Sequence, residues 1–381
     1  MAASTDSAIA LLADLVKIDS INPSLVRGAK GEEEVARRIA LELDQIGVTV
    51  DVTEVAPHRP NVVGVLDGRA PGRSLMLCGH TDTVGIEGME RPFAAEIRDG
   101  KLYGRGAQDM KGGLAAMIGA ARQIVESGGL ARGRLIIAAV VDEEHSSIGA
   151  DALVSRWRAD AAVVTEPTGL DVAVCHKGFQ WVHLETRGRA AHGSRPRDGR
   201  DAILRMGRVL HRLEALDRRV QHGRSHPLLG TASLHASVID GGHELSSYPV
   251  RARLTIERRT LPGEASDVAL TEANEILAAI RHEDAEFEGE ATLIFGRDGY
   301  EIDESHPLPE LLVRASQSVG TSPARVGMTF WTDAAILGTA GIPSVLFGPG
   351  GAGLHSPEEY VFVEDVCRCR DALVELVRTF T

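Results

Sequence analysis

The sequence is poor in several residue types that mark particular classes of protein. Its 381 residues include only 4 cysteines, and aromatic residues make up 4% of the chain. Four cysteines in so long a chain are too few for a disulfide framework, which favours a reducing, cytoplasmic location. No apolar run approaches the roughly 20 residues of a membrane-spanning helix, so we expect no membrane association. The segment MAASTDSAIALLADLVKI lacks the basic start of a signal peptide and predicts an amphipathic helix.

Positive charge is also in deficit. The chain carries 41 basic and 54 acidic residues, which gives a formal net charge of −13. A surface of this sign repels phosphate backbones, and it argues against sequence-independent binding of nucleic acid. With 43% hydrophobic and 25% charged residues, the composition is typical of a globular protein. At about 150 residues per domain, the length predicts two or three domains.

The first part of the chain alternates short apolar runs with helical patterns. The apolar runs end in polar or glycine-rich sequence and lie at 61–66, 74–79, 135–141, 161–165 and, much later, 343–348. Helical spacing of apolar residues is found at 31–47, 111–127 and 363–380. Buried strands that alternate with helices predict an α/β sheet covered on both faces.

From about residue 174 the pattern becomes strand, helix, strand, strand, helix, and its second helix covers 264–282. Such a succession predicts a compact α+β unit inserted into the α/β domain. We therefore expect a discontinuous α/β domain of residues 1–173 and 285–381, interrupted by an inserted domain of residues 174–284.

Histidines and carboxylates follow the ends of several predicted strands, where open α/β sheets place their ligand sites. Each has an ordinary explanation when it is taken alone. Asp109 directly precedes a helix, as an N-cap residue would, and the acidic residues after 135–141 fit a solvated loop. Taken together they form a mixed nitrogen and oxygen set suited to zinc or a similar divalent ion. The candidate ligands are His80, Asp109, Glu144, Glu166 and His355, with Asp82 to orient His80 and Glu143 as a general base.

These residues lie in the motifs GHTDTV, GRGAQDMKGG, DEEHSS, TEP, AHGSRP, RRTLPGE and GPGGAGLHSPEEY. In order and spacing the motifs resemble the dinuclear-zinc aminoacylase and carboxypeptidase family, which includes acetylornithine deacetylase and succinyl-diaminopimelate desuccinylase. The resemblance extends over essentially the whole chain. It implies a zinc-peptidase-like α/β/α catalytic domain, an inserted ferredoxin-like α+β dimerisation domain and a homodimer. It also implies two divalent metal ions, with zinc as the expected ion and cobalt as the alternative.

The resemblance further implies the role of each ligand. Asp109 would bridge both metals, His80 and Glu166 would complete one metal, and Glu144 and His355 would complete the other. Glu143 would take a proton from the metal-bridging water and pass it to the leaving amine. His192 would reach into the active site of the partner subunit and help to hold the oxyanion.

Four positions are expected to contact substrate. Arg259 matches the arginine that binds the substrate carboxylate, although the adjacent Arg258 remains an alternative. Gly350 belongs to a glycine-rich loop whose backbone amides line the substrate pocket in the resembling family. Ser246 stands where that family usually has an asparagine. Trp331 stands where many members have glycine, and it would either narrow the acyl pocket or pack in the core.

The sequence therefore predicts a cytoplasmic, metal-dependent amidohydrolase that removes an N-acyl group from an amino acid or related small amide. Acetylornithine deacetylase-like activity is the leading specific prediction. A dipeptidase or carboxypeptidase with the same machinery is the enzymatic alternative, and its substrate would be a small peptide. A non-catalytic binding relative is a third possibility, which the presence of Glu143 argues against, because a binding module needs no general base.

Overall fold

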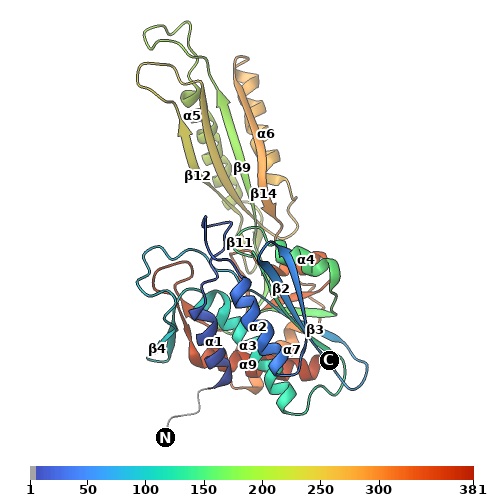
Figure 1. Ribbon diagram of the computed structural model, residues 1–381. Helices are drawn as coiled ribbons and strands as arrows, with labels where there is room; N and C mark the ends of the chain where they lie inside the picture. The colour runs from blue at the N-terminus through green and yellow to red at the C-terminus, as the bar shows by residue number, and fades with distance from the viewer. Residues whose placement is uncertain (1–5) are drawn as a thin grey trace. The chain divides into compact units, whose positions relative to one another are not determined.

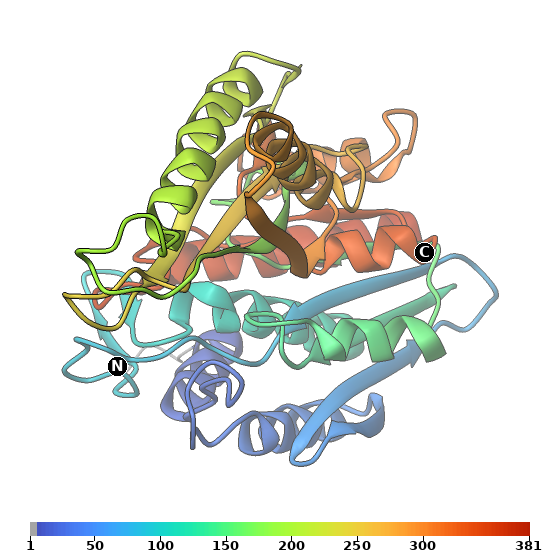
Figure 2. The same cartoon turned by 90° about the horizontal axis from the view of Figure 1, so that it is seen from above.

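The computed structural model describes residues 6–381 and divides the chain into two units (Figures 1 and 2). The first unit comprises the described residues up to Val174, together with Ile302–Val326 and Thr332–Thr381. The second unit comprises Cys175–Glu301 and Gly327–Trp331. The α/β class expected from the sequence is confirmed. Both units consist of more than one segment of the chain.

A mixed sheet forms the centre of the first unit. In spatial order its strands are β1 (Thr49–Ala56), β2 (Arg59–Asp67), β6 (Arg134–Val140), β3 (Ser74–His80), β7 (Ala161–Val164), β17 (Ser344–Leu346) and β8 (Val172–His176), the last of which is also paired by β16 (Arg325–Met328). The neighbours β6, β3, β7 and β17 are parallel to one another. Their carboxyl ends therefore lie at the same edge of the sheet, where residues far apart in the sequence come together.

Helices cover this sheet. They are α1 (Ser7–Lys17), α2 (Glu33–Gln45), α3 (Gly112–Glu126), α4 (Ile148–Arg156), α7 (Leu308–Ser318), α8 (Ala334–Thr339) and α9 (Val363–Phe380). Helices α1, α3, α7 and α9 pack on one another, whereas α4 packs on α8. Consecutive residues are buried along β3, β6 and β7, as expected of strands covered on both faces.

A smaller four-stranded sheet in the first unit brings two distant loops together. Its order is β18 (Gly351–Ala352), β19 (Tyr360–Phe362), β5 (Lys101–Tyr103) and β4 (Glu96–Arg98). The antiparallel pairing of β19 with β5 sets Tyr360 opposite Tyr103. The residues just before β19 therefore lie beside those just after β5, which lead into the π-helical turn at Ala107–Lys111 and then into α3.

The second unit is an α+β fold in the order β9 (Gly178–Arg187), α5 (Ala202–Gln221), β12 (Ser233–Gly241), β13 (Arg251–Thr260), α6 (Val268–Glu283) and β14 (Glu288–Arg297). Its antiparallel sheet has the spatial order β12, β13, β9, β14, which is a ferredoxin-like arrangement. The short strands β10 (Ser225–His226) and β11 (Gly230–Thr231) pair with each other, and β15 (Tyr300–Glu301) pairs with the end of β8.

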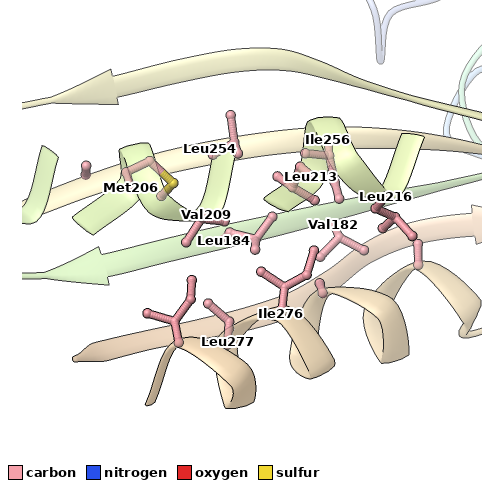
Figure 3. Close-up of a cluster of buried hydrophobic side chains, with 14 of the residues drawn as sticks. Val182, Leu184, Met206, Val209, Leu213, Leu216, Leu254, Ile256, Ile276 and Leu277 are labelled. Carbon is pink, nitrogen blue, oxygen red and sulfur yellow. The ribbon is translucent and has the colours of Figure 1, made fainter. Parts of the chain in front are cut away.

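Aliphatic side chains build the core of the second unit (Figure 3). Val209 and Leu213 from α5 and Leu277 from α6 point toward the same face of the sheet. They meet Val182 on β9 and Ile256 on β13, which are both buried. The helices are amphipathic and each buries one apolar stripe on the sheet, which explains how a chain with few aromatic residues forms a core.

The end of the inserted domain differs from the expectation from sequence. We expected the chain to leave this domain at residue 284, but the second unit continues to Glu301 and includes Gly327–Trp331. The reason is β14, which pairs with β9 from Glu288 to Arg297 and is the fourth strand of the sheet. Its alternating pattern of half-buried residues, EGEATLIFGR, was missed in the sequence.

Acid pH is expected to destabilise the second unit through His176. Burial lowers the pKa of this imidazole to about 4, because the ring packs against Trp331 and Tyr300 and, among residues 6–381, hydrogen-bonds only to the Lys177 carbonyl. The unfolded chain binds the proton at an ordinary pKa near 6.5. Stability present above pH 6.5 is therefore lost as the pH falls toward 4, by up to about 3 kcal/mol.

Urea unfolding between pH 7 and pH 4.5 measures this effect. His176→Phe is expected to weaken the pH dependence, and His282→Gln on the surface of α6 serves as the control. An identical pH dependence in wild type and His176→Phe would contradict the prediction.

Among the described residues, no helix is long and apolar enough to cross a membrane. All four cysteines are free thiols.

Candidate metal centre

Four of the expected site residues follow parallel strands of the central sheet. His80 is the last residue of β3, and Glu143 and Glu144 follow β6. Glu166 lies two residues after β7. Because these strands are adjacent and parallel, the four side chains lie at one edge of the sheet.

Asp109 and His355 come from outside the central sheet. Asp109 lies in the π-helical turn before α3, and His355 lies in the loop between β18 and β19. His355 has a φ of +58°, a left-handed conformation that is uncommon for residues other than glycine. The structure thus brings together all six residues that the sequence assigned to the two metals and the general base.

The two oxygens of Asp109 face two different histidines. Oδ1 lies 3.1 Å from Nε2 of His80, and Oδ2 lies 3.3 Å from Nε2 of His355. Glu144 Oε2 is 3.1 Å from the same nitrogen of His355. Glu166 Oε1 is 3.8 Å from Nε2 of His80. Asp109 therefore stands between two donor groups, as a carboxylate shared by two cations would.

Burial and like charge dominate the electrostatics of this cluster. Burial, followed by repulsion from Glu166, raises the pKa of Glu143 well above its usual range. Burial and the charge of Asp109 raise the pKa of Glu144 to about 7. Hydrogen bonds with Asp109 and then with Glu144 raise the pKa of His355 to about 10. So many buried carboxylates stay ionised together only where positive charge compensates them.

The residues present fit divalent cations. Donor atoms of His80, Asp109 and Glu144 lie within 4.8 Å of one another, as do those of His80, Glu143 and Glu166. Glu144 Oε1 is buried and has no hydrogen-bond partner among the described residues. Imidazole and carboxylate donors in this proportion suit zinc and related ions. Glu143 belongs to the second of these groups, so position alone allows it to be a ligand or a base.

Asp82 contacts His80 through its main-chain carbonyl rather than its carboxylate. The Nδ1 atom of His80 lies 2.9 Å from the main-chain carbonyl oxygen of Asp82 and 3.6 Å from its carboxylate. The carbonyl accepts the Nδ1 proton, which leaves the Nε2 lone pair for a metal. The carboxylate instead accepts the backbone N–H groups of Glu143 and Glu144, both at 3.1 Å. Asp82 thus positions the base and one ligand as well as His80.

A buried polar network supports Asp82 from behind. Asn22 donates from Nδ2 to Asp82 at 2.8 Å and to Asp142 at 3.1 Å. Arg59 contacts Asp142 at 2.8 Å and is held in turn by Glu32. All of these side chains are buried. Sequence reasoning missed them because Asn22 lies 60 residues from Asp82 and 120 from Asp142, and no local motif links them.

The structure does not support a substrate contact for the amide of Gly350. Its N–H donates to the Asp365 carboxylate at 3.1 Å, and its carbonyl accepts the N–H of Phe362. The adjacent Gly351 pairs with Val361 in the small sheet. The glycine-rich loop is therefore a hydrogen-bonded structural element at this point.

His192 and Ser246 lie on two loops of the second unit that pair with each other. His192 forms a bridge with Ser247, and Gly193 donates to the carbonyl of Ser246 at 2.7 Å. Nδ1 of His192 accepts the N–H of Ser194 at 3.2 Å. In the neutral ring the proton is therefore on Nε2, and the exposed imidazole presents a hydrogen-bond donor.

The two neighbouring arginines of β13 differ in their surroundings. Arg258 is buried and fully engaged, with Glu264 at 2.9 Å and Glu272 at 3.1 Å. The side chain of Arg259 is 33% exposed and pairs with Glu257. Strand alternation sends the two side chains to opposite faces. Of the two, only Arg259 has an accessible guanidinium.

Trp331 packs within the second unit. The residue is 8% exposed, and its ring lies near His176 and Phe179, with the Arg297 guanidinium 5.8 Å from the ring centroid. The indole N–H donates to the carbonyl of Asp298 at 3.1 Å. These contacts agree with the core-packing alternative, and a substrate contact by Trp331 stays a prediction.

A third cluster of possible ligands, Cys175, His226 and Glu301, lies in the second unit. Nδ1 of His226 accepts the N–H groups of Leu228 and Leu229, so Nε2 carries the proton and donates to Glu301 at 3.1 Å. Burial and the charge of Glu301 raise the pKa of the Cys175 thiol to about 12. The His226 ring and the Cys175 thiol of this cluster therefore carry protons. Together with the hydrogen bonds of His226, these protons argue against metal binding.

Comparison with known proteins agrees with the fold. The chain superposes on a tripeptidase from Staphylococcus aureus with a TM-score of 0.81, at 20% identity and over 98% of each chain. It is 31% identical to an acetylornithine deacetylase from Myxococcus xanthus over 97% of both sequences. It is 28% identical to an N-formyl-4-amino-5-aminomethyl-2-methylpyrimidine deformylase from Bacillus subtilis, over 92% of this chain and 89% of the relative.

The fold and these relatives define a hydrolase that acts on amide or peptide bonds. The chain belongs to Peptidase family M20/M25/M40, whose family model matches residues 76–379. The resemblance seen in the sequence motifs is thereby confirmed.

Proposed function

We propose that this protein removes an N-acyl group from an amino acid or a related small amide, with acetylornithine deacetylase-like specificity. The observation that carries the proposal is Asp109, whose two oxygens face His80 and His355, while the half-buried carboxylate of Glu143 lies close to His80. The similarity to an acetylornithine deacetylase over almost the full length supports the choice of substrate class.

Five side chains would hold two divalent cations, with zinc as the expected ion. They are Asp109 between the two sites, His80 and Glu166 on one side, and Glu144 and His355 on the other. Such cations, when bound, make water more acidic and stabilise negative charge on a carbonyl oxygen. Glu143 takes a proton from the attacking water and delivers it to the leaving amine.

Three residues of the second unit are proposed to act on the substrate. The Nε2–H donor of His192 would stabilise the oxyanion in the active site of the partner subunit. Arg259 would bind the substrate carboxylate, for which a guanidinium offers two parallel hydrogen bonds. Ser246 would contact the substrate from the loop that pairs with His192.

We also propose that the chain forms a homodimer through the second unit. Strand β12 is an edge of its sheet, and Val238 and Ile239 on this strand are 63% and 56% exposed. Leu204 on α5 is 71% exposed. An apolar edge strand of this kind favours pairing with a second copy.

A cytoplasmic location is proposed as well, supported by the four free thiols.

Incubation of the zinc- or cobalt-loaded enzyme with two substrate panels tests the activity. We expect release of acetate from N-acetyl amino acids, with N-acetylornithine among the best substrates. Release of free amino acids from dipeptides, without acetate release, would replace the proposal by a peptidase function. Formate release from N-formyl amides would indicate the activity named for the Bacillus subtilis relative.

A further inference from the structure

We propose that Glu359 and Arg105 are positioning residues that fix the orientation of Asp109 and tie it to the loop of His355. The inference rests on the proposed metal-dependent function, because it concerns how the bridging carboxylate is held. Neither residue contacts the reacting groups. Both lie in the first unit and are almost completely buried, at 1% and 2% exposure.

The small sheet places Glu359 beside the loop that carries Asp109. Because Tyr360 on β19 pairs with Tyr103 on β5, Glu359 comes to lie next to Gly104. The N–H of Gly104 donates to the main-chain oxygen of Glu359 at 3.2 Å. The Glu359 side chain then extends under the turn formed by residues 105–109.

The carboxylate of Glu359 accepts hydrogen bonds from three backbone amides of this turn. Oε1 accepts the N–H of Gln108 at 2.9 Å and that of Asp109 at 3.1 Å. Oε2 accepts the N–H of Gly106 at 3.0 Å. Gly106 has a φ of +78°, and amides that converge around a left-handed residue form an anion-binding nest. The peptide of Asp109 is thus fixed by a buried carboxylate and not by its own helix.

Arg105 connects this arrangement to two other loops. Its Nη1 atom donates to Oε2 of Glu359 at 2.6 Å, and its Nη2 atom donates to the carbonyl of Ser356, next to His355, at 3.3 Å. Its Nε atom donates to the carbonyl of Gly85 at 2.8 Å, in the segment that follows β3. One guanidinium therefore links the Asp109 turn, the His355 loop and the segment after His80.

All hydrogen-bonding positions of the Glu359 carboxylate face donors, so an uncharged amide cannot replace it. In Glu359→Gln one oxygen becomes an NH2 group that must face backbone N–H groups or the Arg105 guanidinium. The turn would shift to avoid this contact, and Asp109 would lose its orientation toward both histidines. Removal of such supporting groups typically lowers metal affinity about 10- to 100-fold.

Metal titration of the full-length protein tests the inference without any substrate. Zinc affinity and stoichiometry are measured by competition with a chromophoric chelator, and the coordination environment is followed by the absorption spectrum of the cobalt form. We expect Glu359→Gln to bind metal about 10-fold or more weakly and to change the cobalt spectrum. In the same variant we expect kcat to fall while KM stays near the wild-type value, because no substrate contact is altered.

Glu42→Gln is the matched control. Glu42 is also buried and paired with two arginines, Arg38 and Arg122, but it lies on α2 and supports no site residue. It should lose stability without a change in metal affinity or cobalt spectrum. Arg105→Lys is the second test variant, which keeps the charge but loses the fork of donors, and it should weaken metal binding in the same direction.

Wild-type zinc affinity and cobalt spectrum in folded Glu359→Gln and Arg105→Lys would overturn the inference. An equal loss of metal affinity in Glu42→Gln would also overturn it, because the effect would then be one of general stability. Absence of deacylation by a wild type that binds two metals would refute the proposed function alone.

Discussion

Replacement of Glu143 by glutamine is expected to lower kcat by about 10² to 10⁴ and to leave both metals bound. Glutamine has nearly the same shape as glutamate but cannot take up a proton from water. The backbone N–H of residue 143 still donates to Asp82, so the loop keeps its position. Turnover at saturating substrate and metal content per chain measure the two parts of this prediction.

Glu144→Gln is the informative comparison, because the two residues are adjacent and both are bonded to Asp82 through their amides. Glu144 faces His355, and its replacement should reduce metal content as well as activity. Loss of a metal in Glu143→Gln would show that Glu143 is a ligand, as its position beside His80 and Glu166 allows. Wild-type turnover would remove Glu143 from the mechanism altogether.

Replacement of His192 by alanine is expected to lower kcat by about 10² to 10³ with no change in metal content, as the loss of one oxyanion donor does. The imidazole has its Nε2 proton free because Ser194 occupies Nδ1. The control is His222→Ala, an exposed histidine at the end of α5 whose ring bonds to the carbonyl of Arg218. It should have near wild-type turnover.

Subunit mixing tests whether His192 acts in the partner's active site. If it does, a heterodimer of one Glu143→Gln subunit and one His192→Ala subunit contains one intact site. Random mixing of the two inactive variants should then restore about a quarter of wild-type activity, since half of the dimers are mixed and each has one working site of two. No recovery from a demonstrably mixed dimer would mean that His192 acts within its own chain or not at all.

Residues that follow strands could be found from the sequence because the local pattern determines where a strand ends. His80, Glu144 and Glu166 each follow a buried apolar run, and parallel strands bring such ends to one edge. The opposite orientations of Arg258 and Arg259 follow from the two-residue period of a strand. Sequence alone left open which of the two is accessible, because that depends on what packs on each face.

Contacts between distant segments could not be found in this way. The carboxylate of Asp82 bonds to the loop of Glu143, and Asn22 joins Asp82 to Asp142. The amide of Gly350 is taken by Asp365, 15 residues further along the chain. Side chains can meet such partners only when packing has placed their elements, and no short-range spacing in the sequence indicates it.

The sequence by itself determined the α/β class, through buried apolar runs that alternate with helical patterns, and a metallohydrolase, through the resemblance of its motifs to a known family; composition only excluded other classes of protein. The fold decided three further points. It extended the second unit through β14, because pairing with β9 completes its sheet. It gave Asp82 a second role through its carboxylate. It also joined Glu359 and Arg105 to the loops of Asp109 and His355, because β19 pairs with β5 across more than 250 residues.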